Sequence, residues 1–339
     1  MNKEQPLSSQ SIKAEALRLG FDACGIARVT RVDDATAAAF DRWIGEGRHA
    51  GMDYMARHGD ARYHPDYVLP GCRTIVSLAM NYYPAHRMTD DQYQFAFYAY
   101  GRDYHDVMKA RIRELAKTIF ESSCFSEDLL PIEEEMSGGQ RGSWRGLEGV
   151  HFRIAVDSAP LLERYWALQA GLGWIGRNHN LIIPHKGSFF VLGELLLTAD
   201  VDCYDSPIEP RCGACRKCIE ACPTCALTDS GVNAHRCLSY LTIEHRGPFS
   251  PEQAALIRQQ PTPYYIYGCD RCQRACPHNH YAQPNDTAEF QPSQALLAMT
   301  PKDWCQLTRE KYIELFRGSP VKRAKYEGLM RNIETITQE

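Results

Sequence analysis

Residues 212–223 read CGACRKCIEACP, four cysteines separated by two, two and three residues, with a proline directly after the last. This spacing is typical of the run in which three thiolates bind one [4Fe-4S] cluster and the fourth binds a second cluster. A shorter run in residues 269–277, CDRCQRACP, supplies three more thiolates and again ends in proline. Together the two runs predict a small ferredoxin-like module that holds two four-iron clusters.

Two complete ligand sets need an eighth cysteine, and Cys237 is the best candidate. Crossing the runs then gives each cluster four ligands. The first set is Cys212, Cys215, Cys218 and Cys276, and the second is Cys222, Cys237, Cys269 and Cys272. A pair of zinc sites is the alternative, but zinc knuckles rarely show this signature twice. The leftover Cys203 and Cys225 are interpreted as small buried side chains.

The rest of the chain places these thiols in a reducing environment. The first twenty residues, MNKEQPLSSQSIKAEALRLG, lack the apolar core of a secretory signal, and no apolar run is long enough to span a membrane. We therefore expect a cytoplasmic protein whose cysteines bind metal rather than form disulfides. A net charge of -4, from 38 Lys and Arg against 42 Asp and Glu, excludes a generally basic nucleic-acid binder. Any nucleic-acid contact must be a local patch.

Cysteine density divides the chain, because ten of its 14 cysteines lie between residues 203 and 276. We expect an N-terminal domain over residues 1–200, a cysteine-rich module over 201–285 and a C-terminal helical segment over 286–339. Helices are predicted at 11–19, 34–47, 106–120 and 160–170, and strands at 74–80, 152–156, 181–183 and 189–197. This mixture predicts an α+β fold in which helices pack on a sheet. Residues 122–149 are rich in Glu, Gly and Ser and are interpreted as a long exposed loop.

Two neighbouring segments of the N-terminal domain are candidate functional sites. Residues 171–176, GLGWIG, match a dinucleotide-binding pattern, but a helix precedes them and strands follow, the reverse of the required order. We instead interpret residues 171–176 as a turn whose backbone closely approaches another group, such as a large planar cofactor. Just before it, Asp157 ends a strand. Asp157 or Ser158 is a candidate cap for the next helix, with Pro160 in its first turn, and Asp157 is also a candidate general acid.

An ordered set of motifs resembles the epoxyqueuosine reductase family over most of the chain. The motifs are VDSAPLLER (156–164), AGLGWIGRNHNLI (170–182), GSFFVLGELLL (187–197), CGACRKCIEACPTCAL (212–227), RCLSYLTIEHRG (236–247), IYGCDRCQRACP (266–277) and SPVKRAKYEGLMRNI (319–333). The resemblance implies a cobalamin-dependent iron–sulfur oxidoreductase of queuosine biosynthesis, which reduces the epoxide of epoxyqueuosine at the tRNA wobble position to an alkene. It also implies kinship with reductive dehalogenases and a nitroreductase-like cobalamin domain.

The resemblance also implies roles for particular residues. It makes Asp157 the proton donor and assigns cobalamin contacts to Arg62, Tyr104, His105, Trp174, Asn178, Ser188 and Ser239. The D-x-H-x-x-G motif that replaces the lower cobalamin base with histidine is absent, since Met108 stands where its glycine would follow His105. We therefore expect cobalamin to bind base-off without a histidine ligand. Some family members carry a C-terminal helical-repeat extension, and we expect none here. The local patch of Lys322, Arg323, Lys325 and Arg331 is then the expected tRNA contact, with a solvated charged face as the alternative.

The expected partners are tRNA carrying epoxyqueuosine and a reduced flavodoxin- or ferredoxin-type electron donor, with the protein acting as a monomer. Two other functions fit parts of the same sequence. A reductive dehalogenase-like corrinoid enzyme acting on a small molecule shares the cofactors but needs no basic patch. A ferredoxin-type electron-transfer protein needs the clusters but no corrinoid.

Overall fold

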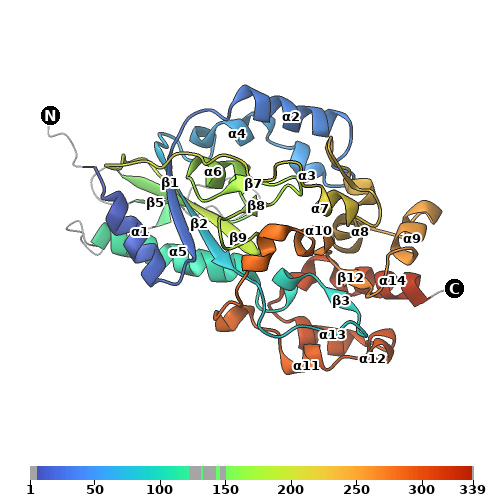
Figure 1. The fold of residues 1–339 in the computed structure, drawn as a ribbon. Coiled ribbons are helices and arrows are strands. Elements are labelled where there is room, and N and C mark those ends of the chain that lie inside the picture. Colours follow the sequence, from blue (N-terminus) through green and yellow to red (C-terminus); the bar gives the residue numbers. More distant parts are fainter. Residues whose placement is uncertain (1–5, 122–130, 133–142, 146–149, 338–339) are drawn as a thin grey trace.

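A large antiparallel sheet forms the centre of the N-terminal half (Figure 1). The computed structural model describes residues 6–121, 131–132, 143–145 and 150–337. Within them the sheet has six strands in the order β1-β2-β9-β6-β5-β4. Their bounds are β1 (Ala23–Arg28), β2 (Thr74–Asn81), β9 (Phe190–Leu197), β6 (His151–Ala155), β5 (Ser143–Arg145) and β4 (Pro131–Ile132).

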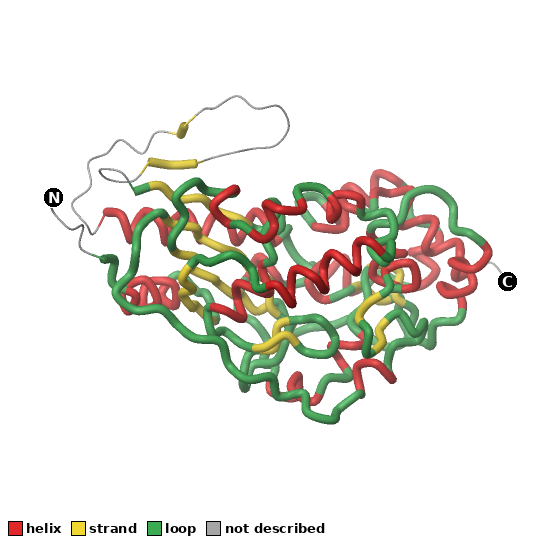
Figure 2. Tube along the Cα trace, turned by 90° about the horizontal axis from the view of Figure 1, so that it is seen from above, coloured by secondary structure: helices red, strands yellow, loops and turns green. Residues whose placement is uncertain are grey.

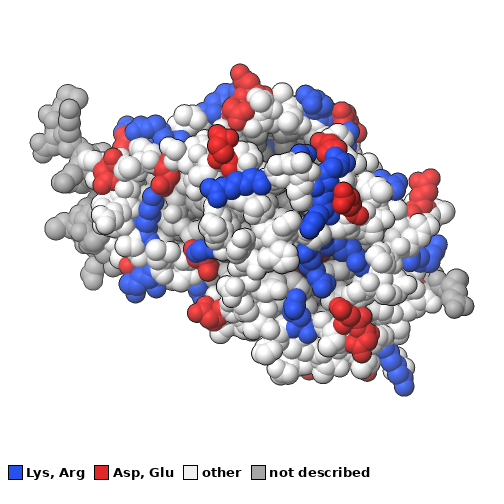
Figure 3. All heavy atoms as spheres, viewed as in Figure 1, with Lys and Arg blue, Asp and Glu red and all other residues white. Residues whose placement is uncertain are grey.

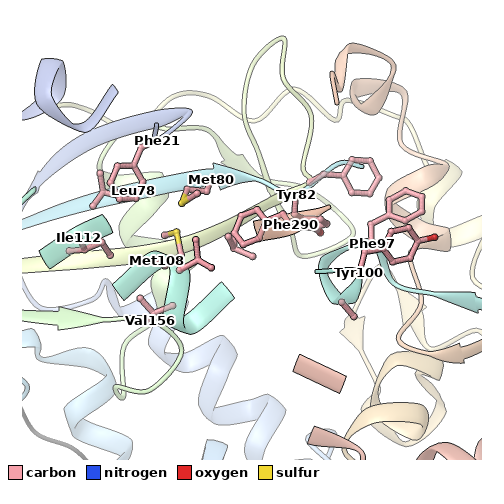
Figure 4. Packing of buried hydrophobic residues seen from close by; sticks show 14 of the residues in the cluster. Phe21, Leu78, Met80, Tyr82, Phe97, Tyr100, Met108, Ile112, Val156 and Phe290 are labelled. Atoms are coloured by element: carbon pink, nitrogen blue, oxygen red, sulfur yellow. The ribbon is translucent and has the colours of Figure 1, made fainter. Parts of the chain in front are cut away.

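Helices cover both faces of this sheet, so its central strands β2 and β9 are buried along nearly their whole length. Side chains alternate along β2, with Leu78 and Met80 on one face and Ile75 and Ala79 on the other. The first face packs against α1 (Ser9–Arg18) and α5 (Tyr104–Glu121), as Figure 4 shows for Leu78 and Met80 beside Met108 and Ile112. The second face packs against α6 (Glu163–Gln169) and, farther out, α2 (Asp34–Gly45) and α4 (Gly59–Tyr63). Arg62 of α4 donates hydrogen bonds to carbonyls of the short helix α3 (Asp53–Ala56).

Local signals explain where the long helices begin. The side chain of Ser8 accepts a hydrogen bond from the backbone N–H of Ser11 and caps α1, and Asp33 caps α2 in the same way through Thr36. The α+β prediction is confirmed, and the expected long helices and strands lie within a few residues of α1, α2, α5, β2, β6 and β9. The strand expected at 181–183 is β8 (Leu181–Ile182), which pairs with β7 (Trp174–Ile175).

The segment interpreted as a long exposed loop, residues 122–149, lies mostly outside the described residues. Its two described pieces are strands rather than loop, because β4 pairs with β5 and β5 pairs with β6 at one edge of the large sheet. The loop interpretation is therefore wrong for 131–132 and 143–145. Glu, Gly and Ser have low strand propensity, so the composition of this segment gave no sign of strands. The two short strands form because they pair with the edge of the sheet at β6, which provides their backbone hydrogen bonds.

The cysteine-rich half consists of short elements. They are α7 (Lys217–Glu220), β10 (Leu227–Thr228), β11 (Gly231–Val232), α8 (Leu238–Ile243), α9 (Pro251–Arg258), β12 (Tyr265–Tyr267) and α10 (Arg271–Arg274). Strand β12 pairs in parallel with β3 (Gln94–Phe95), which belongs to the N-terminal half of the sequence. This pairing joins the two halves through main-chain hydrogen bonds.

The C-terminal segment comprises α11 (Gln294–Leu297), α12 (Pro301–Cys305), α13 (Arg309–Phe316), the 3-10 helix η7 (Pro320–Arg323) and α14 (Lys325–Thr337). It shares one hydrophobic core with the N-terminal half. The ring of Phe95 lies 5.2 Å from that of Trp304 and 5.5 Å from that of Phe316, measured between centroids. The expected C-terminal helical segment, residues 286–339, therefore packs with the N-terminal half in this core. The tube view of Figure 2 shows the C-terminal helices beside the cysteine-rich elements, at the end of the molecule opposite the large sheet.

No helix among the described residues combines the length and apolar character needed to cross a membrane.

Candidate active site and thiol groups

Asp157 lies just beyond β6, where the backbone turns sharply before α6. Its φ is +54°, in the left-handed region that side chains other than glycine rarely adopt. The backbone N–H of Asp157 donates a hydrogen bond to Oε1 of Glu163 at 2.5 Å. Helix α6 begins only at Glu163, its N-cap is Leu162, and no side chain caps it. The interpretation of Asp157 or Ser158 as a helix cap, with Pro160 in the first turn, is therefore wrong.

The carboxylate of Asp157 contacts two aromatic side chains from the first turn of α5. The Tyr104 hydroxyl donates a hydrogen bond to Oδ2 of Asp157, and Nε2 of His105 lies 3.7 Å from the same oxygen. The two rings stack at 4.2 Å between centroids. Burial, followed by the negative charge of Asp157, raises the pKa of Tyr104 well above its ordinary value. Tyr104 therefore remains a hydrogen-bond donor to Asp157 at every physiological pH.

Asp103 fixes His105 from the opposite side. Its Oδ1 lies 2.6 Å from Nδ1 of His105, and its Oδ2 lies 2.6 Å from Nζ of Lys322 in η7. Burial alone would raise the pKa of Asp103, but the hydrogen bonds with His105 and Lys322 lower it below its ordinary value overall. Asp103 is thus a permanent carboxylate that orients the imidazole toward Asp157.

Two further carboxyl groups lie behind Asp157 on the α6 face of the sheet. Glu194 is fully buried in β9, where Oγ of Ser77 donates to its Oε1 at 3.3 Å. Burial and the nearby charge of Asp157 raise the pKa of Glu194 to about 8. Burial and the charges of Glu194 and Asp157 raise the pKa of Glu163 well above its ordinary value. Sequence reasoning missed both residues; the only signal was a lone acid inside the apolar strand FVLGELLL.

The first thiol group draws on both cysteine runs. Helices α7 and α10 pack against each other (Figure 1) and bring the two runs together. Burial raises the pKa of Cys276, and the charges of Cys212 and Cys215 raise it further. Burial likewise raises the pKa of Cys218, followed by the charges of Cys276 and Cys212. These four thiols therefore lie within electrostatic range of one another.

The second thiol group assembles around the start of α8. Burial raises the pKa of Cys269 to about 12, with a contribution from the charge of Cys237. Burial raises the pKa of Cys272 well above its ordinary value, and the charges of Cys269, Cys237 and Cys222 add to this rise. The structure thus brings together the same two sets of four that the crossed pattern predicts.

Among the described residues, no three Cys, His, Asp or Glu side chains gather tightly enough to hold a single metal ion. The two thiol groups are therefore wider than the ligand set of one ion. The interpretation of Cys203 and Cys225 as buried side chains is wrong, because both are exposed. Cys225 lies in the turn after α7 with a φ of +51°.

The glycine-rich segment 171–176 packs against the chain itself. A Cβ on Gly173 would come within 2.1 Å of the carbonyl oxygen of Ile182, and one on Gly171 within 2.7 Å of that of Ser206. The approach of Gly173 to Ile182 follows from the pairing of β7 with β8. Gly171 and Gly173 thus approach the chain's own backbone, and an approach of this turn to a planar cofactor stays a prediction.

The seven residues expected to contact cobalamin are scattered over the structure. Tyr104 and His105 lie at Asp157, as described above. Arg62 is buried and donates to the carbonyls of Met55 and Tyr54, and Ser188 is buried against Asn279 and Gln273. The backbone N–H of Ser239 bonds the thiol of Cys237. Arg62, Ser188 and Ser239 thus have protein partners.

Trp174 and Asn178 differ from those three residues. Both side chains are buried, and neither Nε1 of Trp174 nor Nδ2 of Asn178 has a hydrogen-bond partner in the described part of the chain. Buried donors without an acceptor are costly and rare in native structures. Of the seven residues expected to contact cobalamin, Trp174 and Asn178 are thus the two whose unpartnered N–H groups are available to a bound group.

The four basic residues expected to contact tRNA have different surroundings. Lys322, Arg323 and Lys325 are exposed, although Lys322 pairs with Asp103 and Arg323 makes a bidentate contact with Glu244. Arg331 is only half-exposed and donates to the carbonyls of Leu241, His245 and Gly247. Burial lowers the pKa of Arg331 to about 10. The structure therefore separates Arg331 from the other three.

A cavity of about 420 Å³ opens at the first thiol group rather than at Asp157. It is lined by residues that include Arg177, Cys212, Gly213 and Asp229. Figure 3 shows Lys and Arg side chains concentrated over the part of the viewed face that carries α7 and α10. The first thiol group thus lies close to a positively charged, accessible surface.

Two family models match the chain. Residues 62–158 match "Epoxyqueuosine reductase QueG, DUF1730", and residues 211–279 match a 4Fe-4S double cluster binding domain. The first match includes Asp157, Tyr104 and His105, and the second includes all eight thiols of the two groups. The cysteine-rich half is thus a double-cluster iron–sulfur domain.

Curated relatives match nearly the whole chain. An epoxyqueuosine reductase of Leadbetterella byssophila is 39% identical over 330 residues, which cover 97% of this chain and 98% of the relative. One from Escherichia coli is 35% identical over 333 residues, 96% of this chain and 79% of the relative. A crystal structure of epoxyqueuosine reductase with a tRNA-Tyr epoxyqueuosine-modified tRNA stem loop aligns with a TM-score of 0.79 and 25% identity, covering 96% of this chain and 80% of that chain.

Proposed function

Because the chain belongs to the epoxyqueuosine reductase family, we propose that it is an oxidoreductase that reduces epoxyqueuosine at the wobble position of tRNA to queuosine. The reaction converts an epoxide to an alkene. It consumes two electrons and two protons and releases one water. The chain must therefore deliver electrons and protons to the same small ring.

The observation that carries this proposal is the setting of Asp157. Its carboxyl is half-exposed, at 55% of its side-chain surface, while Tyr104 and His105 contact the carboxyl and Glu163 accepts from its backbone N–H. A carboxyl that is both fixed and accessible suits general acid catalysis, because the departing epoxide oxygen must receive a proton. We assign proton donation to Asp157. Tyr104 and His105 orient its carboxyl.

Electrons reach this site through the double-cluster domain. We assign one cluster to Cys212, Cys215, Cys218 and Cys276 and the other to Cys222, Cys237, Cys269 and Cys272. The thiol groups described above support both assignments. The first lies near the surface, beside the 420 Å³ cavity, and the second is more deeply buried. A reduced flavodoxin- or ferredoxin-type protein is the proposed donor to the first cluster.

Cobalamin is the proposed group between the clusters and the substrate. The unpartnered donors of Trp174 and Asn178 fit a ligand with many amide carbonyls, and Tyr104 and His105 border Asp157, where substrate and cofactor would meet. The side chains of Arg62 and Ser188 already bond protein groups, whereas only the backbone N–H of Ser239 does so. When bound, cobalamin supplies a metal centre that accepts single electrons and delivers them to the epoxide. His105 is held by Asp103, in keeping with base-off binding without a histidine ligand.

The proposed tRNA contact is the exposed group Lys322, Arg323 and Lys325 at the junction of η7 and α14. Lys322 also pairs with Asp103, which places this group next to the Asp157 site. Phosphate contacts there would position the anticodon loop over Asp157. We further propose that the protein acts as a cytoplasmic monomer.

The test is anaerobic reconstitution with iron, sulfide and cobalamin, followed by an assay on tRNA that carries epoxyqueuosine. We expect conversion to queuosine that depends on cobalamin and on a low-potential electron donor. Failure to convert this tRNA, together with turnover of halogenated small molecules, would instead support the dehalogenase-like alternative. A protein that binds clusters but no corrin would be an electron carrier. Family membership favours the tRNA reductase over both.

A further inference from the structure

Tyr54 is an exposed aromatic side chain that has no part in the functions assigned so far. It lies on the short helix α3 and is 41% exposed. The guanidinium of Arg323, from the basic group proposed to contact tRNA, lies over its ring, with 5.6 Å between Cζ and the ring centroid. We propose that Tyr54 is a stacking platform for an unpaired base of the tRNA anticodon loop, next to the Asp157 site. This inference rests on the proposed function.

The backbone that carries Tyr54 is held by contacts from outside its own helix. Helix α3 spans four residues and has no side-chain cap, and so short a helix is not stable by itself. Arg62 is buried and supports it: its Nε donates to the carbonyl of Met55 at 3.0 Å and its Nη2 to that of Tyr54 at 2.7 Å. Just before α3, the backbone N–H of Gly51 donates to the hydroxyl of Tyr240 at 2.9 Å. Tyr54 therefore projects from a fixed backbone, which reduces the entropy lost when a ligand binds to it.

Three parts of the chain meet at the Tyr54 ring. Tyr54 belongs to the N-terminal half, Arg323 to η7, and Glu244 follows α8 in the cysteine-rich half. The carboxylate of Glu244 accepts from Nε of Arg323 at 2.9 Å and from Nη2 at 2.7 Å. This bidentate contact fixes the guanidinium over the ring. Ligand sites form preferentially at such junctions between parts of a protein.

The Tyr54 ring and the Asp157 site are linked through η7. Next to Arg323, the Nζ of Lys322 lies 2.6 Å from Oδ2 of Asp103. Asp103 in turn holds the imidazole that faces Asp157. In agreement with these contacts, burial raises the pKa of Tyr54 to about 12, and the charge of Asp157 contributes to this rise. The phenol is thus neutral at physiological pH and does not repel phosphate.

The surroundings of Tyr54 favour a nucleobase over other planar groups. Proteins bind unpaired nucleic acid by combining basic side chains, which contact phosphates, with aromatic rings on which bases stack. Lys322 and Lys325 are exposed and supply such basic groups beside Arg323. The corrin ring of cobalamin is the other planar group proposed for this protein. The donors that suit it, on Trp174 and Asn178, belong to the hairpin of β7 and β8 rather than to α3 or η7.

The first experiment measures the affinity of the reconstituted holoenzyme for an anticodon stem-loop RNA by fluorescence anisotropy. Tyr54→Ala should bind this RNA about tenfold more weakly or worse, because the stacked base loses its platform. Tyr54→Leu, which keeps an apolar side chain against Arg323, should lose as much, whereas Tyr54→Trp should retain the affinity. Tyr67→Ala is the matched control, since Tyr67 is 64% exposed in the 3-10 helix η1 (Pro65–Tyr67) and stacks on His64. Wild-type affinity in Tyr54→Leu overturns the inference.

Two further readouts distinguish stacking from a structural role. A fully paired RNA duplex with the same number of phosphates offers no unpaired base, so Tyr54→Ala should bind it as the wild type does. The salt dependence of stem-loop binding should also keep its slope, because stacking releases no counterions. Equal weakening on stem loop and duplex overturns the inference. Loss of the corrin spectrum in Tyr54→Ala would assign the ring to the cofactor and overturns it as well.

Stem loops with one abasic loop position each identify the stacked base. For one position, the wild type should lose affinity and the difference between the wild type and Tyr54→Ala should disappear, because the base and the ring contribute only together. A difference that persists at every loop position shows that Tyr54 stacks on no base and overturns the inference.

The conversion assay separates this inference from the proposed function. If the wild type binds the stem loop through Tyr54 but does not reduce epoxyqueuosine tRNA, the function is wrong and the stacking site stands. If the wild type reduces this tRNA and Tyr54→Ala binds the stem loop as tightly as the wild type, the function stands and the inference fails.

Discussion

The two thiol groups and the Asp157 site are built in different ways. Seven of the eight thiols come from two short runs, 212–222 and 269–276, and α7 and α10 bring these runs together. The Asp157 site instead draws on α5, β6, α6, β9 and η7, from Asp103 to Lys322. The thiol groups thus depend mainly on local spacing, whereas the acid site depends on long-range packing. Substitutions should therefore have separable effects in the two regions.

The largest expected effect comes from Cys276→Ser, which tests the first region. This change removes one ligand of the cluster built on Cys212, Cys215 and Cys218, so iron content should fall from about eight to about four atoms per chain. Turnover should be lost because electrons no longer pass. Iron analysis and the electron paramagnetic resonance spectrum measure the outcome.

The control is Cys225→Ser, which changes an exposed thiol outside both groups and should keep about eight irons. Loss of iron confined to the cluster of Cys269 and Cys272 would show that the runs do not cross. The local geometry described for the thiols would then not be the ligand arrangement of the holoenzyme.

The second effect concerns Asp157→Asn in the acid site. The amide still accepts the hydrogen bond from Tyr104 but cannot deliver a proton, so turnover should fall by roughly 10²–10⁴-fold. Iron content and the corrin spectrum should match the wild type, since Asp157 contacts neither thiol group. Near-normal turnover with both cofactors bound would remove Asp157 from the reaction.

The sequence predicted the thiol groups better than the Asp157 site. Seven of the eight thiols could be grouped from the spacing of the two runs, because a few neighbouring residues set the separation within each run; their assignment as cluster ligands stays a prediction. Asp157 was found through the VDSAP motif, but its helix-cap interpretation failed because α6 begins six residues later, at Glu163. Glu194 was missed because an acid in an apolar strand becomes informative only when Glu163 is seen beside it. The close approach of Gly173 to Ile182 likewise depends on a hairpin that spacing does not reveal.

A smaller effect is expected from Tyr104→Phe. The phenyl ring retains the stack on His105 but loses the hydrogen bond to Asp157, a contact to a charged group worth about 1.5–3 kcal/mol. If that contact holds Asp157 in its reactive orientation, turnover should fall by about tenfold to a hundredfold. Steady-state kinetics on reconstituted protein measure this.

Tyr98→Phe is the matched control, because Tyr98 packs edge-on against Tyr104 but its hydroxyl donates to Tyr267. It should retain most of the turnover. Equal losses in the two variants would mean that aromatic packing, rather than the contact with Asp157, sets the rate.

The smallest expected effect is on tRNA binding. It distinguishes an exposed basic side chain, which can contact phosphate, from one that bonds the protein itself. Lys325 is exposed at the start of α14, so a phosphate contact there would release about one counterion. Lys325→Ala should therefore reduce the slope of log affinity against log salt by about 1, with cluster content and turnover at saturating tRNA unchanged. Lys311→Ala, on α13 and paired with Glu314, is the surface control and should leave the slope as it is. Arg331→Ala should instead lower the stability of the protein, because its guanidinium donates to three carbonyls around α8, and should leave the slope unchanged. If Lys325→Ala and Lys311→Ala give the same slope as the wild type, Lys325 belongs to a solvated face, and the tRNA contact must lie elsewhere on the basic surface.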